Sequence, residues 1–585
     1  MLKTPVPDVT VTNGDELLDF GGARYVGNFH KTLPRHSNNT GEVDPASYVA
    51  FASICDNDLD CEYIPQSTGA TKLINPLAGR AHEMLGPDPR NIHMLPAPSV
   101  LSDSTAAEMV ELAWMANWRD KPLSALASDP DMPKALADIT LSFQRALSSD
   151  RRSTGDLRLG LDLPYKLSGG ALALDINPQT MFRAGLKDED KGPLVSQFML
   201  HDINYGAQLI RSTQVPYGTA ASYGGAGLSG NYLVTAPLWL QAQATGKDMN
   251  GNAYGACNNF NNNAAYYASG AIEVGASGRR RIATMRDLAR FVNRDALHQA
   301  YFNAALLLGG WGAKLDPGNP YSTIYKRQTG FGTLGGPNLL ALVSEVASRA
   351  LKVVWRQKWS HRRLRPEVYG GLMHVQQAGT RAYGLPSWLF NPPLNIQPTM
   401  ASAGYFLPLA FTAGSPAHPA YGAGHATVAG ACVTILKAWF DETQTMVSVM
   451  AGASGSADPS PYYPVNTAVD IWEPGQKTDG PLTPYAGADR AVMTVGGELN
   501  KLAGNIALGR SMGGVHWRSD NTRSLRLGEQ VATVMLKRIL PTYAERPLSL
   551  SYFNFDGNEV TVGSDGKVSV ANDPELTAFY NLREF

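Results

Sequence analysis

The sequence has few charged residues for its length and no strong net charge. Charged side chains make up 17% of the 585 residues, against roughly a quarter in average soluble proteins. The 50 basic and 51 acidic residues leave a net charge of −1, so no overall basic field attracts nucleic acid or an anionic membrane. We infer that part of the surface is covered, for example by other subunits, and that any anion site is built locally.

Cysteine and long apolar runs are also scarce. The four cysteines lack the spacing of a metal site and are too few for a disulfide framework; Cys55 and Cys61 could pair, although free thiols fit better. No apolar run reaches the roughly eighteen residues of a membrane-spanning helix, and the first residues lack the apolar segment of a signal peptide. The cytoplasm is therefore the default expectation, with the periplasm or the cell surface open if the chain is a mature form.

Helical periodicity dominates what is present. Residues 1–103 are rich in Pro, Asp, Asn and Gly and predict an irregular arm. Apolar residues at three- and four-residue spacing predict helices in two further parts, 104–335 and 336–585, and we expect all three parts to form one merged globular unit. The helices expected are 104–118, 132–148, 284–308, 339–359, 425–440, 489–510 and 522–540.

The predicted fold class is therefore mainly α, a helical bundle with long loops. One segment near the C-terminus differs: residues 558–570 alternate apolar and polar residues on both sides of a Gly-Ser-Asp-Gly turn. This pattern predicts a small β-hairpin.

A basic segment is the first candidate for chemistry. In KWSHRRLRP, Lys358 and Arg365 are seven residues apart, which corresponds to two helical turns. Both cations are therefore expected on one face of a helix, with Pro366 marking the end of that helix. Taken alone, a segment this basic is more often a solvated face.

Two further segments add backbone amides and histidines. In SPAHPAYGAGHA a glycine turn opens a helix, so the amides of residues 423–425 lie at a helix N-terminus that attracts anions, beside His425. In LGRSMGGVHWRSD, Arg510 ends a helix, and Asp520 follows four residues after His516, where it can hold one imidazole nitrogen and leave the other free. Each segment alone has a common structural explanation. Together they predict a cage for a tetrahedral oxyanion such as phosphate or vanadate.

The order Lys-x6-Arg-Pro, Gly-His, Arg-x5-His-x3-Asp resembles the signature of the superfamily of vanadium-dependent haloperoxidases and type 2 acid phosphatases. The segments KWSHRRLRPEVYGG, SPAHPAYGAGHA and GFGTLGGPNLL are similar to bromoperoxidases of red algae and cyanobacteria, and the resemblance covers most of residues 190–540. It implies that His516 is the axial ligand of vanadate, with Asp520 behind it. The oxygens of vanadate would be held by Lys358, Arg365, Arg510 and the Gly424 amide.

The resemblance also implies catalytic roles. It makes His425 the acid–base catalyst and gives Lys358 the task of polarising the bound oxidant. His418, seven residues before His425, matches the second histidine of bromoperoxidases and favours bromide. The family's usual Ser-Gly-His reads Ala423-Gly424-His425 here, which removes one hydrogen bond to vanadate, worth about 1–3 kcal/mol if the oxygen is left unpaired.

The implied reaction is the oxidation of bromide, of iodide and in some cases of chloride by hydrogen peroxide to hypohalous acid, which halogenates a small organic acceptor. Phosphate should compete with vanadate, and halide choice should depend on groups such as Trp355, Arg356 and His418. Relatives in red algae and cyanobacteria form homododecamers, so a homo-oligomer, with a dodecamer as one form, is expected. Related enzymes bind structural calcium where residues 316–330 lie, although a Pro-Gly turn explains this segment equally well.

Other functions compete with this interpretation. A phosphohydrolase could use the same cage, with His516 as nucleophile and His425 protonating the leaving group. A non-enzymatic assembly protein would fit the low charge. The G-x-S-x-G match at Ser511 follows a helix instead of a strand, and the G-x-G-x-x-G match at Gly225–Gly230 lacks a strand–turn–helix unit. We favour the haloperoxidase, without nucleic-acid or membrane partners.

Overall fold

The computed structural model describes residues 12–36, 39–154, 165–168, 171–205, 208–210, 214–216, 231–254, 279–391, 393–454, 470–474 and 482–582. These residues are mainly helical, so the predicted fold class is confirmed. In the described ranges no helix is both long and apolar enough to cross a membrane.

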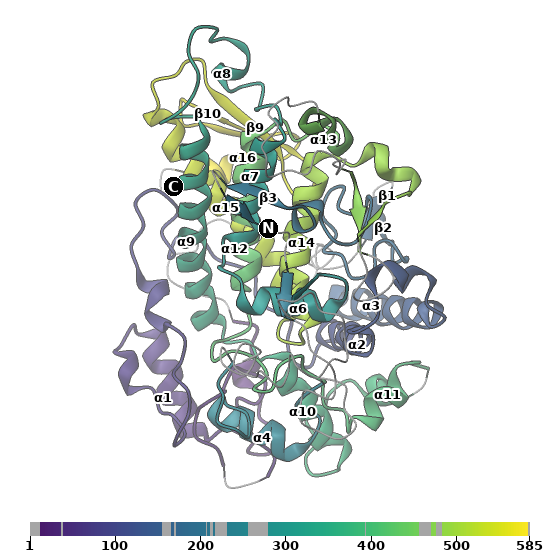
Figure 1. Ribbon diagram of the computed structural model, residues 1–585. Coiled ribbons are helices and arrows are strands. Elements are labelled where there is room, and N and C mark those ends of the chain that lie inside the picture. Colours follow the sequence, from purple (N-terminus) through teal and green to yellow (C-terminus); the bar gives the residue numbers. More distant parts are fainter. Residues whose placement is uncertain are drawn as a thin grey trace.

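Four long helices form the centre of the molecule (Figure 1): α9 (Gly336–His361), α12 (Gly424–Trp439), α14 (Val495–Met512) and α15 (Arg518–Ile539). The helices α12 and α15 each pack against the other three, and the contact of α12 is the more extensive with both α9 and α14. Every residue of α12 except His425 is buried. The exception lies in the first turn of the helix, at the end where an anion site is predicted.

Glycines allow α12 and α15 to approach closely. A Cβ atom on Gly430 would lie 1.9 Å from the carbonyl oxygen of Leu525, and one on Gly528 would lie 2.0 Å from the carbonyl oxygen of Thr427. Real side chains do not tolerate such distances to a backbone atom, so both positions require glycine at this helix separation. The two contacts fix the start of α12 relative to the start of α15.

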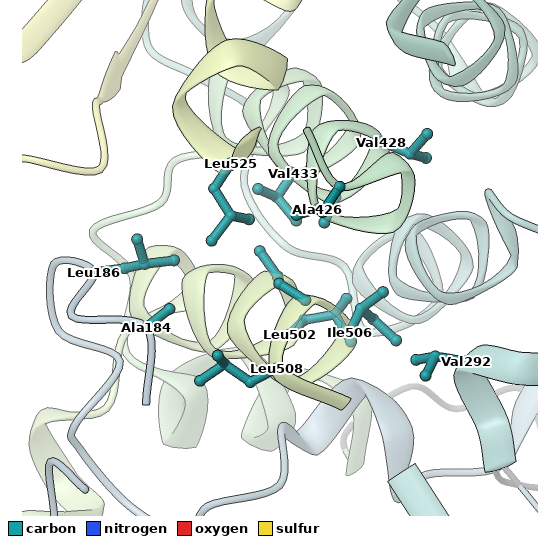
Figure 2. Close-up of a cluster of buried hydrophobic side chains, with 14 of the residues drawn as sticks. Ala184, Leu186, Val292, Ala426, Val428, Val433, Leu502, Ile506, Leu508 and Leu525 are labelled. Atoms are coloured by element: carbon teal, nitrogen blue, oxygen red, sulfur yellow. The ribbon is translucent and has the colours of Figure 1, made fainter. Parts of the chain in front are cut away.

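The described elements share one large hydrophobic core, with members from Ala23 to Tyr580. Figure 2 shows part of this core. Val433 of α12 and Leu525 of α15 lie near each other, and Leu502 and Ile506 of α14 lie below them in this view. A smaller cluster packs the arm against Trp359 of α9. The three-part division of the chain stays a prediction.

The first 103 residues contain more regular structure than predicted. They form α1 (Pro45–Asp56) and the short 3-10 helices η1 (Asp15–Leu17), η2 (Cys61–Tyr63) and η3 (Pro76–Arg80). The side chain of Asp44 accepts a hydrogen bond from the Ser47 amide, and Pro45 occupies the first position of α1. Asp followed by Pro is a helix-start signal, so α1 could have been predicted.

The predicted helix 284–308 is wrong in one respect, because the structure has two helices there, α6 (Met285–Arg294) and α7 (Gln299–Gly310). Asp295 takes an extended conformation and ends α6. Similarly, the segment 489–510 begins as the 3-10 helix η9 (Ala488–Val492) before α14. The predicted segments 104–118, 132–148 and 339–359 are helical, and the helices predicted at 425–440 and 522–540 end one residue earlier, at Trp439 and Ile539.

The expectation that one helix carries Lys358 and Arg365 is wrong. The helix α9 ends at His361, because Arg362 adopts a left-handed conformation with φ 47°. Pro366 begins the next helix, α10 (Pro366–Gln377), and Arg365 is its N-cap residue. Proline is well suited to the first position of a helix, where no amide hydrogen is needed.

The predicted hairpin is confirmed and gains a third strand. Strands β9 (Ser549–Phe553), β10 (Glu559–Gly563) and β11 (Val568–Val570) form an antiparallel sheet in the order β11-β10-β9. Val560 pairs with Val570 on one side and with Tyr552 on the other. The sheet lies at the end of the bundle opposite α10 (Figure 1).

Further helices and strand pairs complete the described fold. The remaining helices are α2 (Asp103–Trp118), η4 (Leu123–Ser128), α3 (Met132–Thr154), η6 (Gln197–Met199), α4 (Ala236–Thr245), α8 (Pro320–Thr323), η8 (Ser387–Phe390), α11 (Gln397–Ser402), α13 (Met446–Ser454), η10 (Leu540–Thr542) and α16 (Pro574–Tyr580). Antiparallel strand pairs are β1 (Tyr165–Ser168) with β2 (Ala171–Leu174), β3 (Ile203–Tyr205) with β4 (Gln208–Ile210), β5 (Gln214–Pro216) with β6 (Arg279–Arg281), and β7 (Trp472–Glu473) with β8 (Thr483–Pro484).

The cysteines that the structure describes are free thiols: Cys55, Cys61 and Cys432. Burial raises the pKa of Cys55 to about 12 and also raises the pKa of Cys61, so neither is a reactive thiolate at neutral pH. Cys257 and the glycine motif Gly225–Gly230 lie outside the described residues.

We predict that Gly430→Ala destabilises the protein by about 3 kcal/mol, because the new methyl group must push α15 away from α12. The matched control is Gly309→Ala in α7, where a Cβ atom meets nothing within 4 Å. That variant should be neutral or gain up to about 1 kcal/mol from helix propensity. Thermal unfolding of both variants tests the prediction, and equal melting temperatures would contradict it.

Candidate functional site

Two buried cations meet one loop, residues 413–422, which we call the site loop. Lys358 lies in the last turn of α9, and its Nζ donates to the carbonyl oxygens of Pro419 at 3.1 Å, of Ala420 at 3.4 Å and of Gly422. Arg365, at the start of α10, donates from Nε to the carbonyl oxygen of His418 at 3.0 Å. The loop therefore fixes both cations through its backbone.

Arg365 also joins two of the three candidate histidines. Its Nη1 lies 2.9 Å from Nε2 of His516, and its Nη2 lies 2.8 Å from Nδ1 of His418. The same Nη1 donates to the carbonyl oxygen of Val515 at 2.6 Å. The pKa of Arg365 is lowered to about 10, mainly by burial, so the guanidinium keeps its charge at neutral pH.

The predicted pairing of His516 with Asp520 is present. Nδ1 of His516 lies 3.0 Å from Oδ2 of Asp520, which also accepts the Trp517 amide. The other carboxylate oxygen accepts a hydrogen bond from Arg363 at 2.7 Å, and both of these side chains are fully buried. A carboxylate held in this way keeps the proton on Nδ1, so the lone pair of Nε2 points toward Arg365 and the cage.

His425 and Arg510 both contact the end of α6. Nε2 of His425 lies 3.1 Å from Oδ1 of Asp295, while Nη1 of Arg510 donates to the carbonyl oxygen of Val292 at 2.8 Å. The same Nη1 donates to the hydroxyl of Tyr254 at 2.6 Å. Sequence reasoning missed Arg363, Asp295 and Tyr254, and the only signal for Asp295 was a carboxylate inside a segment that we took for one helix.

The electrostatics of this cluster favour an anion. The pKa of Lys358 and that of His516 lie well below their ordinary values, because burial and then the neighbouring cations disfavour the protonated forms. The pKa of His418 is lowered for the same reasons, and that of His425 is lowered by burial against the opposing charge of Asp295. A bound oxyanion would relieve this repulsion.

The donor set fits a tetrahedral oxyanion. Nε of Arg510 is buried and has no hydrogen-bond partner among the described residues. Gly424 occupies the first position of α12, where amides have no partner within the helix. The Ala423 amide instead donates to Oγ of Ser524 at 2.8 Å, so one of the three predicted amides is already used. The methyl group of Ala423 cannot donate a hydrogen bond.

Aromatic rings lie at one side of the cluster of cations and histidines. The rings of Trp355 and His418 lie 5.2 Å apart, and Nε1 of Trp355 donates to the carbonyl oxygen of Ile74 in the arm at 3.0 Å. Arg356, also considered for halide choice, pairs with Asp58 at 2.9 Å. Trp355 therefore lies beside His418, whereas Arg356 pairs with Asp58 instead.

Two side predictions can be compared with the structure. Ser511 is buried inside α14, and its Oγ donates to the carbonyl oxygen of His516 at 2.9 Å. This position differs from the exposed strand-to-helix turn that a nucleophilic serine needs.

In the segment 316–330, where related enzymes bind calcium, Asp316 accepts a hydrogen bond from the Gly318 amide at 2.8 Å. No group of three or more His, Cys, Asp or Glu that could hold a metal ion occurs in the described ranges.

Comparison with known proteins places this geometry in context. A family model described as the VCPO second helical-bundle domain matches residues 338–543. The vanadium-dependent bromoperoxidase of Corallina pilulifera is 32% identical over 94% of this chain and 94% of that protein. The bromoperoxidase of Corallina officinalis is 31% identical with the same coverage, and that of Ascophyllum nodosum is 28% identical over 93% of this chain and 87% of that protein.

A solved structure has the same fold. It is the homohexameric structure of the second vanadate-dependent bromoperoxidase from Ascophyllum nodosum, with a TM-score of 0.75 and 24% sequence identity, covering 97% of this chain and 89% of that one. The helical bundle described above is therefore shared along nearly the whole chain.

We predict that sulfate, an oxyanion that does not titrate near neutral pH, binds with net uptake of protons at about pH 6, because the anion raises the lowered pKa values of the histidines and Lys358. Its affinity should fall as the pH rises. Isothermal titration in two buffers of different ionisation enthalpy measures the uptake, and Arg510→Gln should bind more weakly. Identical heats in both buffers would contradict the prediction.

Proposed function

The chain belongs to the family of vanadium-dependent bromoperoxidases, and we propose on that basis that it uses hydrogen peroxide to oxidise bromide to hypobromous acid, which halogenates a small organic acceptor. The observation that supports the proposal most is the convergence of Lys358, Arg365 and His516 on one buried cage. The relatives named above are bromoperoxidases over nearly their whole length. We therefore do not propose the phosphohydrolase or the assembly protein.

Vanadate would be held by cations, a backbone amide and an imidazole from the three candidate segments. We propose that His516 would ligate the vanadium, because the carboxylate of Asp520 leaves Nε2 with a lone pair. Its oxygens would accept hydrogen bonds from Lys358, Arg365, Arg510 and the Gly424 amide. Bound vanadate supplies a Lewis acid that activates peroxide without changing its own oxidation state.

The protein's own side chains would handle protons and charge. We propose His425 as the acid–base catalyst, since its lowered pKa leaves it neutral and able to accept a proton, and since Asp295 then stabilises the imidazolium. Lys358 would withdraw negative charge from the oxidant. His418, neutral and tilted against the ring of Trp355, would lie where the halide approaches. Bromide and iodide are the expected halides, and chloride is a further candidate.

The proposed partners follow from the same cage. Hydrogen peroxide and halide are the substrates, and phosphate should compete with vanadate. We also propose a homo-oligomer, which the homohexameric neighbour and the exposed apolar side chains of the arm support, among them Tyr63 and Met84 at 78% and 85% exposure. The dodecamer and the structural calcium stay predictions.

We predict that His516→Ala loses both bound vanadium and vanadate-dependent bromination, while phosphate, which needs no bond to the imidazole, still binds. Vanadium content, bromination of a phenolic dye and p-nitrophenyl phosphate hydrolysis are measured together. The control is His374→Ala, a histidine of α10 whose Nδ1 contacts the Gly404 carbonyl oxygen. Phosphate-ester cleavage by the wild-type protein without bromination would overturn the proposed function.

We predict that Ala423→Ser tightens vanadate binding about tenfold, because the new hydroxyl can donate to an oxygen that the alanine leaves unpaired. Equilibrium dialysis of the vanadate-free protein measures the dissociation constant without reference to activity. The control is Ala426→Ser on the same helix, which should leave the constant unchanged. Equal constants for Ala423→Ser and the wild type would show that this hydroxyl is not needed here.

A further inference from the structure

The N-terminal arm places a buried ion pair beneath the site loop. Nζ of Lys31 lies 3.2 Å from Oε1 of Glu367, and both side chains are 1% exposed. The arm reaches this position by pairing with the connection between α9 and α10, where the Phe29 amide donates to the carbonyl oxygen of Arg362 at 2.7 Å. Asn28 forms an antiparallel bridge with Arg363 in the same connection.

Both members of the pair hold the start of the site loop. Nζ of Lys31 also donates to the carbonyl oxygens of Ala413 at 2.8 Å and of Ser415 at 2.6 Å. Oε1 of Glu367 accepts the Ser415 amide at 3.0 Å, and the other carboxylate oxygen accepts the Ser415 hydroxyl. The ion pair therefore binds Ser415 through its backbone on both sides and through its side chain.

The next residues of the same loop hold the cations of the cage. The carbonyl oxygen of His418 accepts from Nε of Arg365 at 3.0 Å and from Nη2 at 2.9 Å, and that of Pro419 accepts from Lys358 at 3.1 Å. Only two residues lie between Ser415 and His418, so a displacement of Ser415 would also displace the His418 carbonyl group.

We propose that Lys31 and Glu367 are positioning residues for the oxyanion cage, acting through the site loop on Arg365, Lys358 and His418. The inference rests on the proposed function for the identity of the anion and of the halide. The hydrogen bonds of both side chains go to each other and to the loop, although the charge of Glu367 also favours the protonated form of Arg365. Their effect is to hold the loop whose carbonyl groups orient the two cations.

The energetics favour positioning over stability as the role of the pair. A buried ion pair loses its hydration, and an apolar replacement of similar volume is often as stable or more stable. This pair is unusual because four further hydrogen bonds from the loop complete it. Such a complete set of hydrogen bonds favours a single loop geometry, and a displacement of about 1 Å in a site can cost up to about a hundredfold in rate.

Two variants test the proposal from opposite ends of the contact. Lys31→Met removes the charge and keeps the volume, whereas Ser415→Ala removes only the hydroxyl and should fold in any case. The matched control is Lys501→Met, since Lys501 also pairs with a buried carboxylate, Glu498, with both side chains 1% exposed, but lies in the middle of α14 away from the loop. Phosphate binding to the vanadate-free full chain is measured by titration calorimetry, together with the melting temperature and with KM for bromide and for peroxide in the vanadate-loaded enzyme.

Lys31→Met should weaken phosphate binding about tenfold and raise KM for bromide more than KM for peroxide, and Ser415→Ala should do the same about threefold. Lys501→Met should lower the melting temperature but leave phosphate affinity unchanged. Wild-type affinity in Ser415→Ala, or an equal loss in Lys31→Met and Lys501→Met, would overturn the proposal. A wild-type protein that binds phosphate but never brominates would overturn the proposed function alone, because the phosphate measurement still decides the positioning role.

Discussion

The site depends on the burial of several positive charges at one place. Lys358 and Arg365 are fully buried, and Arg510 is nearly so. Cations without water must be compensated, yet the carboxylate nearest to His516, Asp520, is already paired with Arg363. Backbone carbonyl groups of the site loop accept hydrogen bonds from Lys358 and Arg365, and the largest opposing charge acting on Arg365 is that of Glu367. The cage keeps an excess of positive groups, which we expect to attract an oxyanion.

The close packing of α12 against α15 serves to position the groups of this cage. A cage built from three segments works only if these segments keep fixed positions relative to one another, and no single segment holds more than two of its groups. Glycines at the contact of α12 with α15 bring the start of α12, with Gly424, to a fixed place beside the start of α15, which follows His516. A rigid contact between two backbones suits this purpose, because side chains that could change rotamer do not intervene.

Sequence reasoning named most of the residues of the proposed cage but not the residues that support them. The order of basic, glycine and histidine residues predicted that Lys358, His425 and His516 converge, because residue types with such specific chemistry rarely coincide. The helical argument for placing Lys358 and Arg365 together was wrong, since Arg362 breaks the helix and the site loop, not a shared face, brings them together. Asp295 and Lys31 could not be predicted, because contacts between segments about 130 and 336 residues apart leave no local pattern.

The irregular arm is part of the site and not an appendage to it. The matched helical-bundle domain, residues 338–543, includes all the residues that sequence reasoning placed in the cage, but Lys31, Ile74 and Asp295 lie before it. The carbonyl oxygen of Ile74 in the arm accepts a hydrogen bond from Trp355 and so holds its ring beside His418. Lys31 of the arm holds the start of the site loop at Ser415. An irregular backbone can make both contacts because its path is not restricted to the fixed rise per residue of a helix. The arm's lack of periodicity is therefore what lets it contact the site at two separate points.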